Sequence, residues 1–178
     1  MISSTPVKYL AQLDARVYAR FGRLQEKWGL YRIARIVSFT GDGYLYVLIA
    51  ACALAIAPAT GKSMLVTGCL AVAIELPLYF VLKKFFKRRR PYDVVPSLAQ
   101  IHRPSDEFSF PSGHATAGFM TAYLVSQFFS WALIPMYVWA TLIGLSRVIL
   151  RVHFVSDVIA GMALGTAIAC VSLFVVGH

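Results

Sequence analysis

Long stretches without a charged residue constrain this chain more than any other feature of its sequence. Residues 115–146 form one run of 32 uncharged residues, and residues 43–61 form another. A helix that crosses a bilayer needs about 20 mostly apolar residues, so these runs predict membrane-spanning helices. The whole chain is 58% hydrophobic and only 14% charged, a composition that soluble domains do not have. The sequence therefore predicts an integral membrane protein.

The apolar runs predict a bundle of about five transmembrane helices. At about 1.5 Å per residue, one helix over residues 115–146 would be about 48 Å long, which exceeds a bilayer core of about 30 Å. We therefore expect two helices there, joined by a tight turn near residues 130–135. The five expected spans cover residues 43–61, 63–82, 112–128, 131–150 and 158–176.

The first 35 residues follow a different pattern. Apolar side chains recur at roughly helical spacing between Tyr9 and Leu30, with basic residues between them. This pattern is typical of an amphipathic helix that lies at the membrane interface, although a packed helix or a poorly ordered tail is an alternative. The segment has no signal-peptide features, so we expect it to remain. The predicted fold is a single all-α domain over residues 1–178, with an interfacial segment at 1–35 and a helical core at 41–178.

Positive charge gathers at one end of this predicted bundle. The chain carries 17 Lys and Arg residues, and in a five-span arrangement only Lys62 falls at the opposite end. Because these charges flank helices of hydrocarbon length, anionic lipid headgroups are a simpler partner than nucleic acid. The positive-inside rule favours the cytoplasm for the basic end, and the assignment reverses if the N-terminal segment itself spans the membrane.

The first of three polar clusters covers residues 83–91, KKFFKRRRP. Lys83 and Arg90 are seven residues apart, so they face the same way if the helix continues to Arg90. Pro91 cannot continue the helical hydrogen bonds. The pair is suited to holding a phosphate, but a basic cluster after a span is by itself more typical of a topology anchor.

The second cluster is PSGH at residues 111–114. Pro111 and Ser112 are expected to begin a helix, whose free N–H groups and positive dipole end favour an anion. Gly113 has no side chain to keep a ligand from the backbone. The imidazole of His114 can give or take a proton near neutral pH.

The third cluster is SRVILRVHFVSD at residues 146–157. His153 and Asp157 are four residues apart, so in a helix the carboxylate can hold the imidazole in one tautomer and leave its other nitrogen free. Such an imidazole is a competent nucleophile toward phosphorus. Arg147 adds a planar fork of donors that matches phosphate oxygens. Arg151 is expected to be a headgroup contact or a solvated charge.

Two features fit no cluster. Glu75 lies in the middle of the second expected span, where a carboxylate is costly unless it is paired, neutralised or directed into a polar interior. A structural role and a functional role remain open for it. Residues 92–110 form the longest hydrophilic loop, which is expected either to cover a site and select a lipid or only to connect two helices.

Taken together, the three clusters resemble the signature of the type 2 phosphatidic acid phosphatase family, which includes bacterial acid phosphatases and vanadium haloperoxidases. The family pattern is K-x6-R-P, then P-S-G-H, then S-R-x5-H-x3-D. The matching residues are Lys83, Arg90, Pro91, Pro111, Ser112, Gly113, His114, Ser146, Arg147, His153 and Asp157. The resemblance covers the core from about Gly41 onward and says little about residues 1–35.

The resemblance implies hydrolysis of a phosphomonoester or diphosphate without a metal ion, through a phosphohistidine. His153 would attack phosphorus with Asp157 orienting its ring, and His114 would protonate the leaving oxygen and then activate water. The phosphoryl oxygens would be held by Lys83, Arg90, Ser112, the Gly113 backbone N–H and Arg147. We expect no cofactor, and no His, Cys or carboxylate cluster in the sequence resembles a divalent metal site.

The leading interpretation is a multi-pass lipid-phosphate phosphatase of the bacterial inner membrane. Its candidate substrates are phosphatidic acid, phosphatidylglycerol phosphate, undecaprenyl diphosphate and phosphorylated lipid A. A lipid phosphotransferase that uses the same site, and a non-catalytic lipid-binding or transport protein, are the alternatives. A haloperoxidase is disfavoured because the spans indicate a lipid substrate. Many bacterial relatives are thought to work from the periplasmic face, so the sidedness of the site and the oligomeric state stay open.

Overall fold

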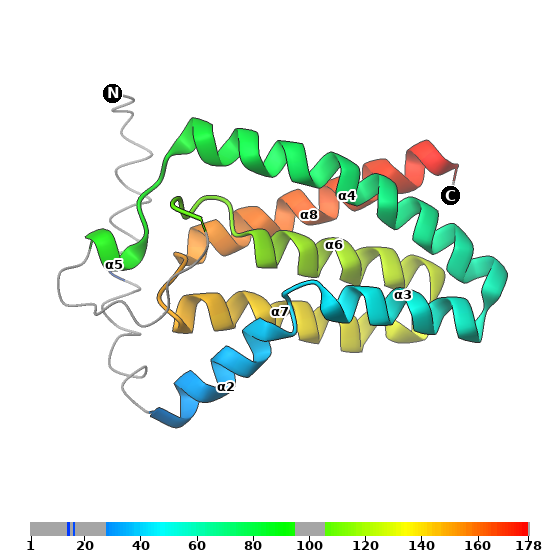
Figure 1. Cartoon of the computed structure of the whole chain (residues 1–178), viewed down its shortest axis with the longest axis horizontal. Helices are drawn as coiled ribbons and strands as arrows, with labels where there is room; N and C mark the ends of the chain where they lie inside the picture. Colours follow the sequence, from blue (N-terminus) through cyan, green and yellow to red (C-terminus); the bar gives the residue numbers. More distant parts are fainter. Residues whose placement is uncertain (1–13, 15, 17–27, 95–105, 178) are drawn as a thin grey trace.

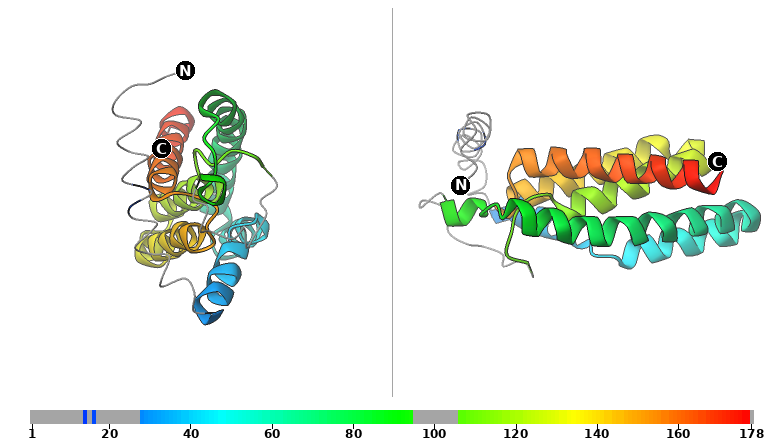
Figure 2. Two further views of the ribbon diagram at one scale, coloured as in Figure 1. Left: turned by 90° about the vertical axis from the view of Figure 1, so that its left-hand side faces the viewer. Right: turned by 90° about the horizontal axis from the view of Figure 1, so that it is seen from above.

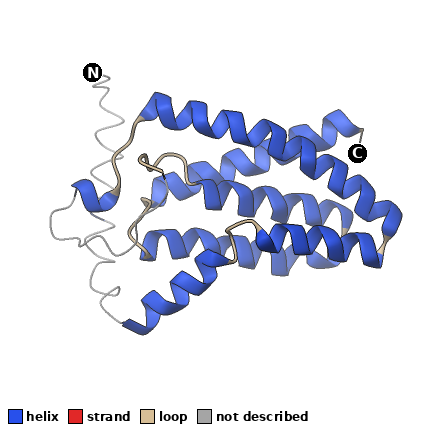
Figure 3. Ribbon diagram, viewed as in Figure 1, coloured by secondary structure: helices blue, strands red, loops and turns tan. Residues whose placement is uncertain are grey.

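The computed structural model describes residues 14, 16, 28–94 and 106–177. Secondary structure in this part of the chain is entirely helical, which confirms the all-α prediction (Figures 1 and 3). Most of the predicted interfacial segment at residues 1–35 lies outside the described residues. The helices are α2 (Trp28–Phe39), α3 (Tyr44–Ile56), α4 (Pro58–Phe86), α5 (Pro91–Val94), α6 (Gly113–Phe128), the 3-10 turn η1 (Ser130–Ala132), α7 (Leu133–Ile149) and α8 (Val155–Val176).

Helix α6 lies at the centre of the bundle. It packs against α4, α7 and α8, while α3 packs against α4 and α2 packs against α7. Figure 2 shows the long helices side by side from two further directions. The end of α4 and the starts of α6 and α8 lie toward the same end of the bundle, at the left of Figure 1. This arrangement gathers the three polar clusters although they are far apart in the sequence.

Each of the five apolar runs forms a helix, but not every one of these helices has the length of a membrane span. Among the described residues, three segments are long and apolar enough: Pro58–Val94, Ser130–Ile149 and Val155–Val176. The pair α2 and α3, bent by 52°, makes a fourth if it counts as one broken span. Helix α6 has only 16 residues and α3 only 13. The first break falls at Ala57 rather than near Lys62, because Pro58 takes the first turn of α4, where its missing N–H costs no hydrogen bond.

The outward face of the bundle is apolar. Large hydrophobic side chains are exposed along the helices, among them Val47 on α3, Phe80 on α4, Val138 on α7 and Phe174 on α8, the last of these 85% exposed. A soluble protein would bury such residues, whereas hydrocarbon tails are a suitable neighbour for them. The exposed apolar surface supports the assignment of this chain as an integral, multi-pass membrane protein.

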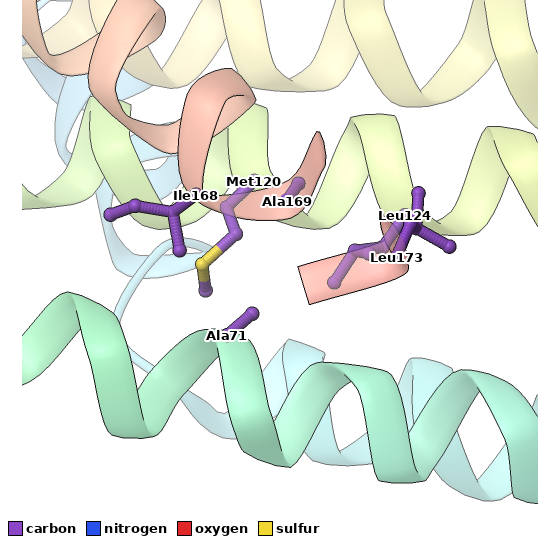
Figure 4. Packing of buried hydrophobic residues seen from close by; sticks show 6 residues of the cluster. All are labelled: Ala71, Met120, Leu124, Ile168, Ala169 and Leu173. Carbon is purple, nitrogen blue, oxygen red and sulfur yellow. The ribbon is translucent and has the colours of Figure 1, made fainter. Parts of the chain in front are cut away.

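The interior contains small apolar clusters where three helices meet. Figure 4 shows one of them, built from Ala71 of α4 with residues of α6 and α8. The other members of this cluster are Met120, Leu124, Ile168, Ala169 and Leu173. The cluster joins α4, α6 and α8, so packing here fixes how the end of α4 and the starts of α6 and α8, where polar residues of the three clusters lie, are placed relative to one another.

Two glycines let α8 lie directly against α6. A Cβ atom placed on Gly165 would be 2.1 Å from the carbonyl oxygen of Thr116, and one on Gly161 would be 2.6 Å from that of Ser112. Glycines four residues apart allow two membrane helices to approach by their backbones. This contact sets the start of α6 beside the start of α8.

Replacing Gly165 by alanine is expected to lower the melting temperature of the detergent-solubilised protein. The added methyl group forces the backbones of α6 and α8 apart, and overpacking of this kind costs about 1–3 kcal/mol. Gly68 on α4 is the matched control, because a Cβ there meets nothing within 4 Å. Equal melting temperatures for Gly165→Ala and Gly68→Ala would contradict the close helix contact.

Candidate active site

The structure brings all three polar clusters together, and most of their side chains are buried. Arg90, Ser112 and Asp157 are fully buried, and Lys83, Arg147 and His153 are nearly so. Charged groups are costly to bury without partners, so this concentration of them requires compensating contacts or a bound ion of opposite sign.

Hydrogen bonds to main-chain carbonyl oxygens connect the clusters to one another. The backbone N–H of Ser112 donates to the carbonyl oxygen of Asp157 at 3.1 Å, which ties the start of α6 to α8. The N–H of Ser109 donates to the carbonyl oxygen of Arg88 at 2.8 Å. The Arg90 guanidinium donates to the carbonyl oxygen of Val152 at 2.7 Å. The relative positions of the clusters therefore rest on backbone contacts.

The orientation of the His153 ring is set by a backbone carbonyl. Its Nδ1 lies 2.7 Å from the carbonyl oxygen of Ser109. A carbonyl oxygen only accepts hydrogen bonds, so Nδ1 carries the proton and the lone pair of the neutral ring lies on Nε2. Burial lowers the pKa of His153 to about 3, partly opposed by Asp157 and reinforced by the positive charges of Arg147 and Arg90. The imidazole is thus neutral at neutral pH, the state that a nucleophile needs.

Asp157 does not hold the imidazole in the way that the spacing of four residues predicts. The distance from its Oδ2 to Nδ1 of His153 is 3.8 Å, beyond a hydrogen bond. Its carboxylate instead accepts the backbone N–H of Phe154 at 2.8 Å and the Arg88 guanidinium at 2.6 Å. The reason is that α8 begins at Val155, so His153 precedes the helix and the two residues are not on adjacent turns.

Lys83 and Arg90 converge on one carboxylate although a single helix does not carry both. Helix α4 ends at Phe86, and Lys87 takes a left-handed conformation with φ 46°, so Arg90 follows in an irregular segment. Both cations pair with Asp106, Arg90 at 2.8 Å, and the Tyr79 hydroxyl donates to the same carboxylate at 3.0 Å. The prediction that one continuous helix carries both residues on the same face is therefore wrong, but both cations still contact the same carboxylate.

Several buried donors of the site have no hydrogen-bond partner among the described residues. They are the hydroxyl of Ser112, the Nε of Arg90 and the Nε of Arg147. Ser112 stands at the N-cap position of α6, yet its side chain makes no capping hydrogen bond. Buried donors are rarely left without an acceptor, so these three groups suit a bound oxyanion whose oxygens would accept their hydrogen bonds. A Cβ added to Gly113 would lie 2.9 Å from the Tyr79 ring, so a larger residue does not fit at this position.

His114 lies beside a residue that the motifs do not include. Its Nε2 is 2.6 Å from Oδ1 of Asp42, in the break between α2 and α3. Arg147 likewise donates from Nη1 to the hydroxyl of Ser38, near the end of α2, at 2.5 Å. Sequence reasoning missed both partners. The available signal was the single acidic residue between Gly41 and Gly43, just before an apolar run.

Other site residues were missed for a different reason. Ser109 and Asp106 belong to the hydrophilic loop at residues 92–110, whose role the sequence left open. Arg88 lies inside the basic run, where nothing marks it out from Arg89. Arg151, expected at headgroups or in solvent, is buried, with only 8% of its surface exposed.

Comparisons with known proteins agree with this geometry. A family model described as the PAP2 superfamily matches residues 60–177. Decaprenylphosphoryl-5-phosphoribose phosphatase of Mycobacterium tuberculosis is 33% identical over 150 residues, which cover 83% of this chain and 81% of that protein. Undecaprenyl-diphosphatase of Sulfolobus acidocaldarius is 33% identical over 135 residues, 74% of this chain and 64% of that protein.

A solved membrane protein has a similar fold. The crystal structure of a transmembrane PAP2-type phosphatidylglycerolphosphate phosphatase from Bacillus subtilis superposes with a TM-score of 0.71 at 25% sequence identity. The match covers 98% of this chain and 88% of that one. The similarity therefore extends over nearly the whole of both chains.

Proposed function

This chain belongs to the PAP2 superfamily and is an integral membrane lipid phosphatase, and we propose that it acts through a phosphohistidine on His153. One observation carries the proposal: the buried His153 ring donates from Nδ1 to the Ser109 carbonyl and so has its lone pair on Nε2. Around it lie buried cations and unsatisfied donors, which suit a phosphoryl group.

In the proposed first step, Nε2 of His153 attacks phosphorus in line with the leaving oxygen. An N–P bond forms, the bond between phosphorus and the lipid oxygen breaks, and that oxygen takes a proton from His114. In the second step, His114 removes a proton from water, the resulting hydroxide attacks phosphorus, and the N–P bond breaks. The products are the dephosphorylated lipid and inorganic phosphate, and both histidines return to their starting states.

The cations have a separate role, which is to stabilise the phosphoryl oxygens in both transition states. We assign this role to Lys83, Arg90 and Arg147, together with the hydroxyl of Ser112 and the backbone N–H of Gly113. Preorganised donors in a buried site are among the largest contributions to catalysis of phosphoryl transfer. The phosphoryl group must displace Asp106 from Lys83 and Arg90 before it can bind there.

The substrate that we propose is a membrane lipid with a terminal phosphate or diphosphate. Support comes from the names of the relatives, which cover a polyprenyl phosphoribose, a polyprenyl diphosphate and phosphatidylglycerol phosphate. The exposed apolar helices place the protein in a bilayer, and we assign it to the bacterial inner membrane. Anionic headgroups are the proposed partners of the basic end of the bundle.

The test is release of inorganic phosphate by the full-length protein, purified in detergent and assayed with EDTA. The panel contains phosphatidic acid, phosphatidylglycerol phosphate, undecaprenyl diphosphate and decaprenylphosphoryl-5-phosphoribose, each with a labelled phosphate. We expect release that persists under chelation, and a quenched protein whose label is lost in acid but kept in alkali, as a phosphohistidine requires. Folded protein that releases nothing from the whole panel, or only with added metal, would contradict the proposal.

A further inference from the structure

A segment outside the three motifs contacts two of their residues. Residues 38–43 comprise the end of α2 and the turn that connects it to α3, and they precede the region that the family model matches, which starts at residue 60. Within the segment, the hydroxyl of Ser38 accepts a hydrogen bond from Arg147, and Oδ1 of Asp42 lies 2.6 Å from Nε2 of His114. The break between the two helices is therefore part of the active site.

The segment is held in place by its own contacts. The indole N–H of Trp139 on α7 donates to the hydroxyl of Thr40 at 2.9 Å, and that hydroxyl donates to the carbonyl oxygen of Val37 at 2.6 Å. A Cβ on Gly41 would lie 3.0 Å from Cδ2 of His114, so the backbone packs against the imidazole. Gly43 has φ 103°, a conformation that favours glycine. These contacts fix where the Asp42 carboxylate points.

A carboxylate at this position has a definite effect on the imidazole. An ionised carboxylate only accepts hydrogen bonds, so Nε2 of His114 carries a proton in this contact and the ring cannot rotate without losing it. The negative charge of the carboxylate also lies within hydrogen-bond distance of the ring, where it attracts the positive charge of an imidazolium. Both effects suit a group that must donate a proton in the first step and accept one in the second.

We propose that Asp42 is a positioning residue that keeps His114 oriented and protonated for transfer to the leaving lipid oxygen. With Nε2–H directed at Asp42, the proton that moves is the one on Nδ1, and the same nitrogen takes the proton from water in the second step. Asp42 itself touches neither the phosphoryl group nor the leaving oxygen. The inference rests on the proposed function, because it assigns a role to a residue that acts through His114.

The experiment compares two leaving groups. An alkoxide from a short-chain phosphatidic acid needs a proton to depart, whereas p-nitrophenolate from p-nitrophenyl phosphate departs without one. For Asp42→Asn we expect kcat with the lipid to fall about tenfold or more, with little change in KM. With the aryl phosphate we expect the burst of p-nitrophenolate, which reports the first step alone, to change within about twofold. Asp42→Glu should recover part of the activity on the lipid.

Two controls separate this role from a structural one. Asp93→Asn changes an exposed carboxylate on α5 and should leave both substrates unaffected. In a His114→Ala background, Asp42→Asn should cause no further loss on the lipid, since residues that act as a unit are not additive. A purely structural role would lower the rate of the first step equally for both substrates, and the loss would persist in that background.

Three results would overturn the inference. One is an equal loss in the rate of the first step on both substrates, and another is a loss that remains without His114. The third is an increase in kcat/KM for Asp42→Asn, which would mean that the carboxylate competes with substrate for the imidazole. Failure of the proposed function is distinguishable, because the wild-type protein would then release no phosphate from either compound.

Discussion

Replacing His153 by alanine abolishes phosphate release if its Nε2 forms the bond to phosphorus. We expect the rate with every lipid to fall at least about a thousandfold, because no other group takes over the covalent step. The labelled protein intermediate should vanish together with turnover. The measurement is phosphate release and retained label after a rapid quench, for wild type and variant at equal concentrations of monodisperse protein.

A second variant keeps this prediction falsifiable if alanine harms folding. Alanine leaves the buried carbonyl of Ser109 without its donor, and an unsatisfied buried group costs about 1–3 kcal/mol. Asparagine carries an amide that can donate to the same carbonyl but offers no nucleophile. His153→Asn should therefore melt closer to wild type while remaining inactive. A folded asparagine variant that keeps more than about a tenth of the activity would rule out His153 as the nucleophile.

Replacing Arg90 by alanine is expected to reduce kcat/KM by about a hundredfold or more, as does loss of one preorganised donor in a buried site. The same change should lower thermal stability, because Arg90 is fully buried and donates to the carbonyl oxygens of Val152 and Phe108. Both quantities are measured on purified protein, as phosphate release and as melting temperature in detergent.

The neighbouring arginine supplies the control for this prediction. Arg89 is exposed, so Arg89→Ala removes the same charge from the same segment without removing a buried donor. Arg90→Lys keeps the charge and loses the planar fork, and it should resemble alanine more than wild type in kcat/KM. Near-normal turnover by a folded Arg90→Ala protein would show that the guanidinium does not bind the phosphoryl group.

The gathering of the three clusters was predictable from sequence, because each lies where an apolar run begins or ends. Helices of similar length that cross one layer must bring such ends to two faces only. The local geometry was not predictable in the same way. The four-residue spacing of His153 and Asp157 indicates a pair on adjacent helical turns, but α8 begins two residues after His153. The imidazole therefore donates its hydrogen bond to the Ser109 carbonyl oxygen and not to Asp157.

Contacts between distant segments account for what else was missed. Asp42 and Ser38 carry no motif, and only the bend between α2 and α3 directs them at His114 and Arg147. Arg151 looks like a surface charge in the sequence, yet the turn between α7 and α8 buries it. The start of the second apolar helix also differs from the prediction of residue 63, because α4 begins at Pro58, before the charged Lys62.

The carboxylate of Asp106 bears on the selectivity of the site for a phosphomonoester over the phosphodiesters of ordinary membrane lipids. Ordinary phospholipids have phosphodiester groups with one negative charge each, whereas a terminal phosphomonoester carries about 1.5 to 2 negative charges at neutral pH. The Asp106 carboxylate already places one negative charge beside Lys83 and Arg90, and it is part of the same chain. A diester offers no more charge than the group it must replace, and a monoester does. If Lys83 and Arg90 bind the phosphoryl group as proposed, we therefore expect the abundant phosphodiester lipids of the membrane to compete poorly for the site.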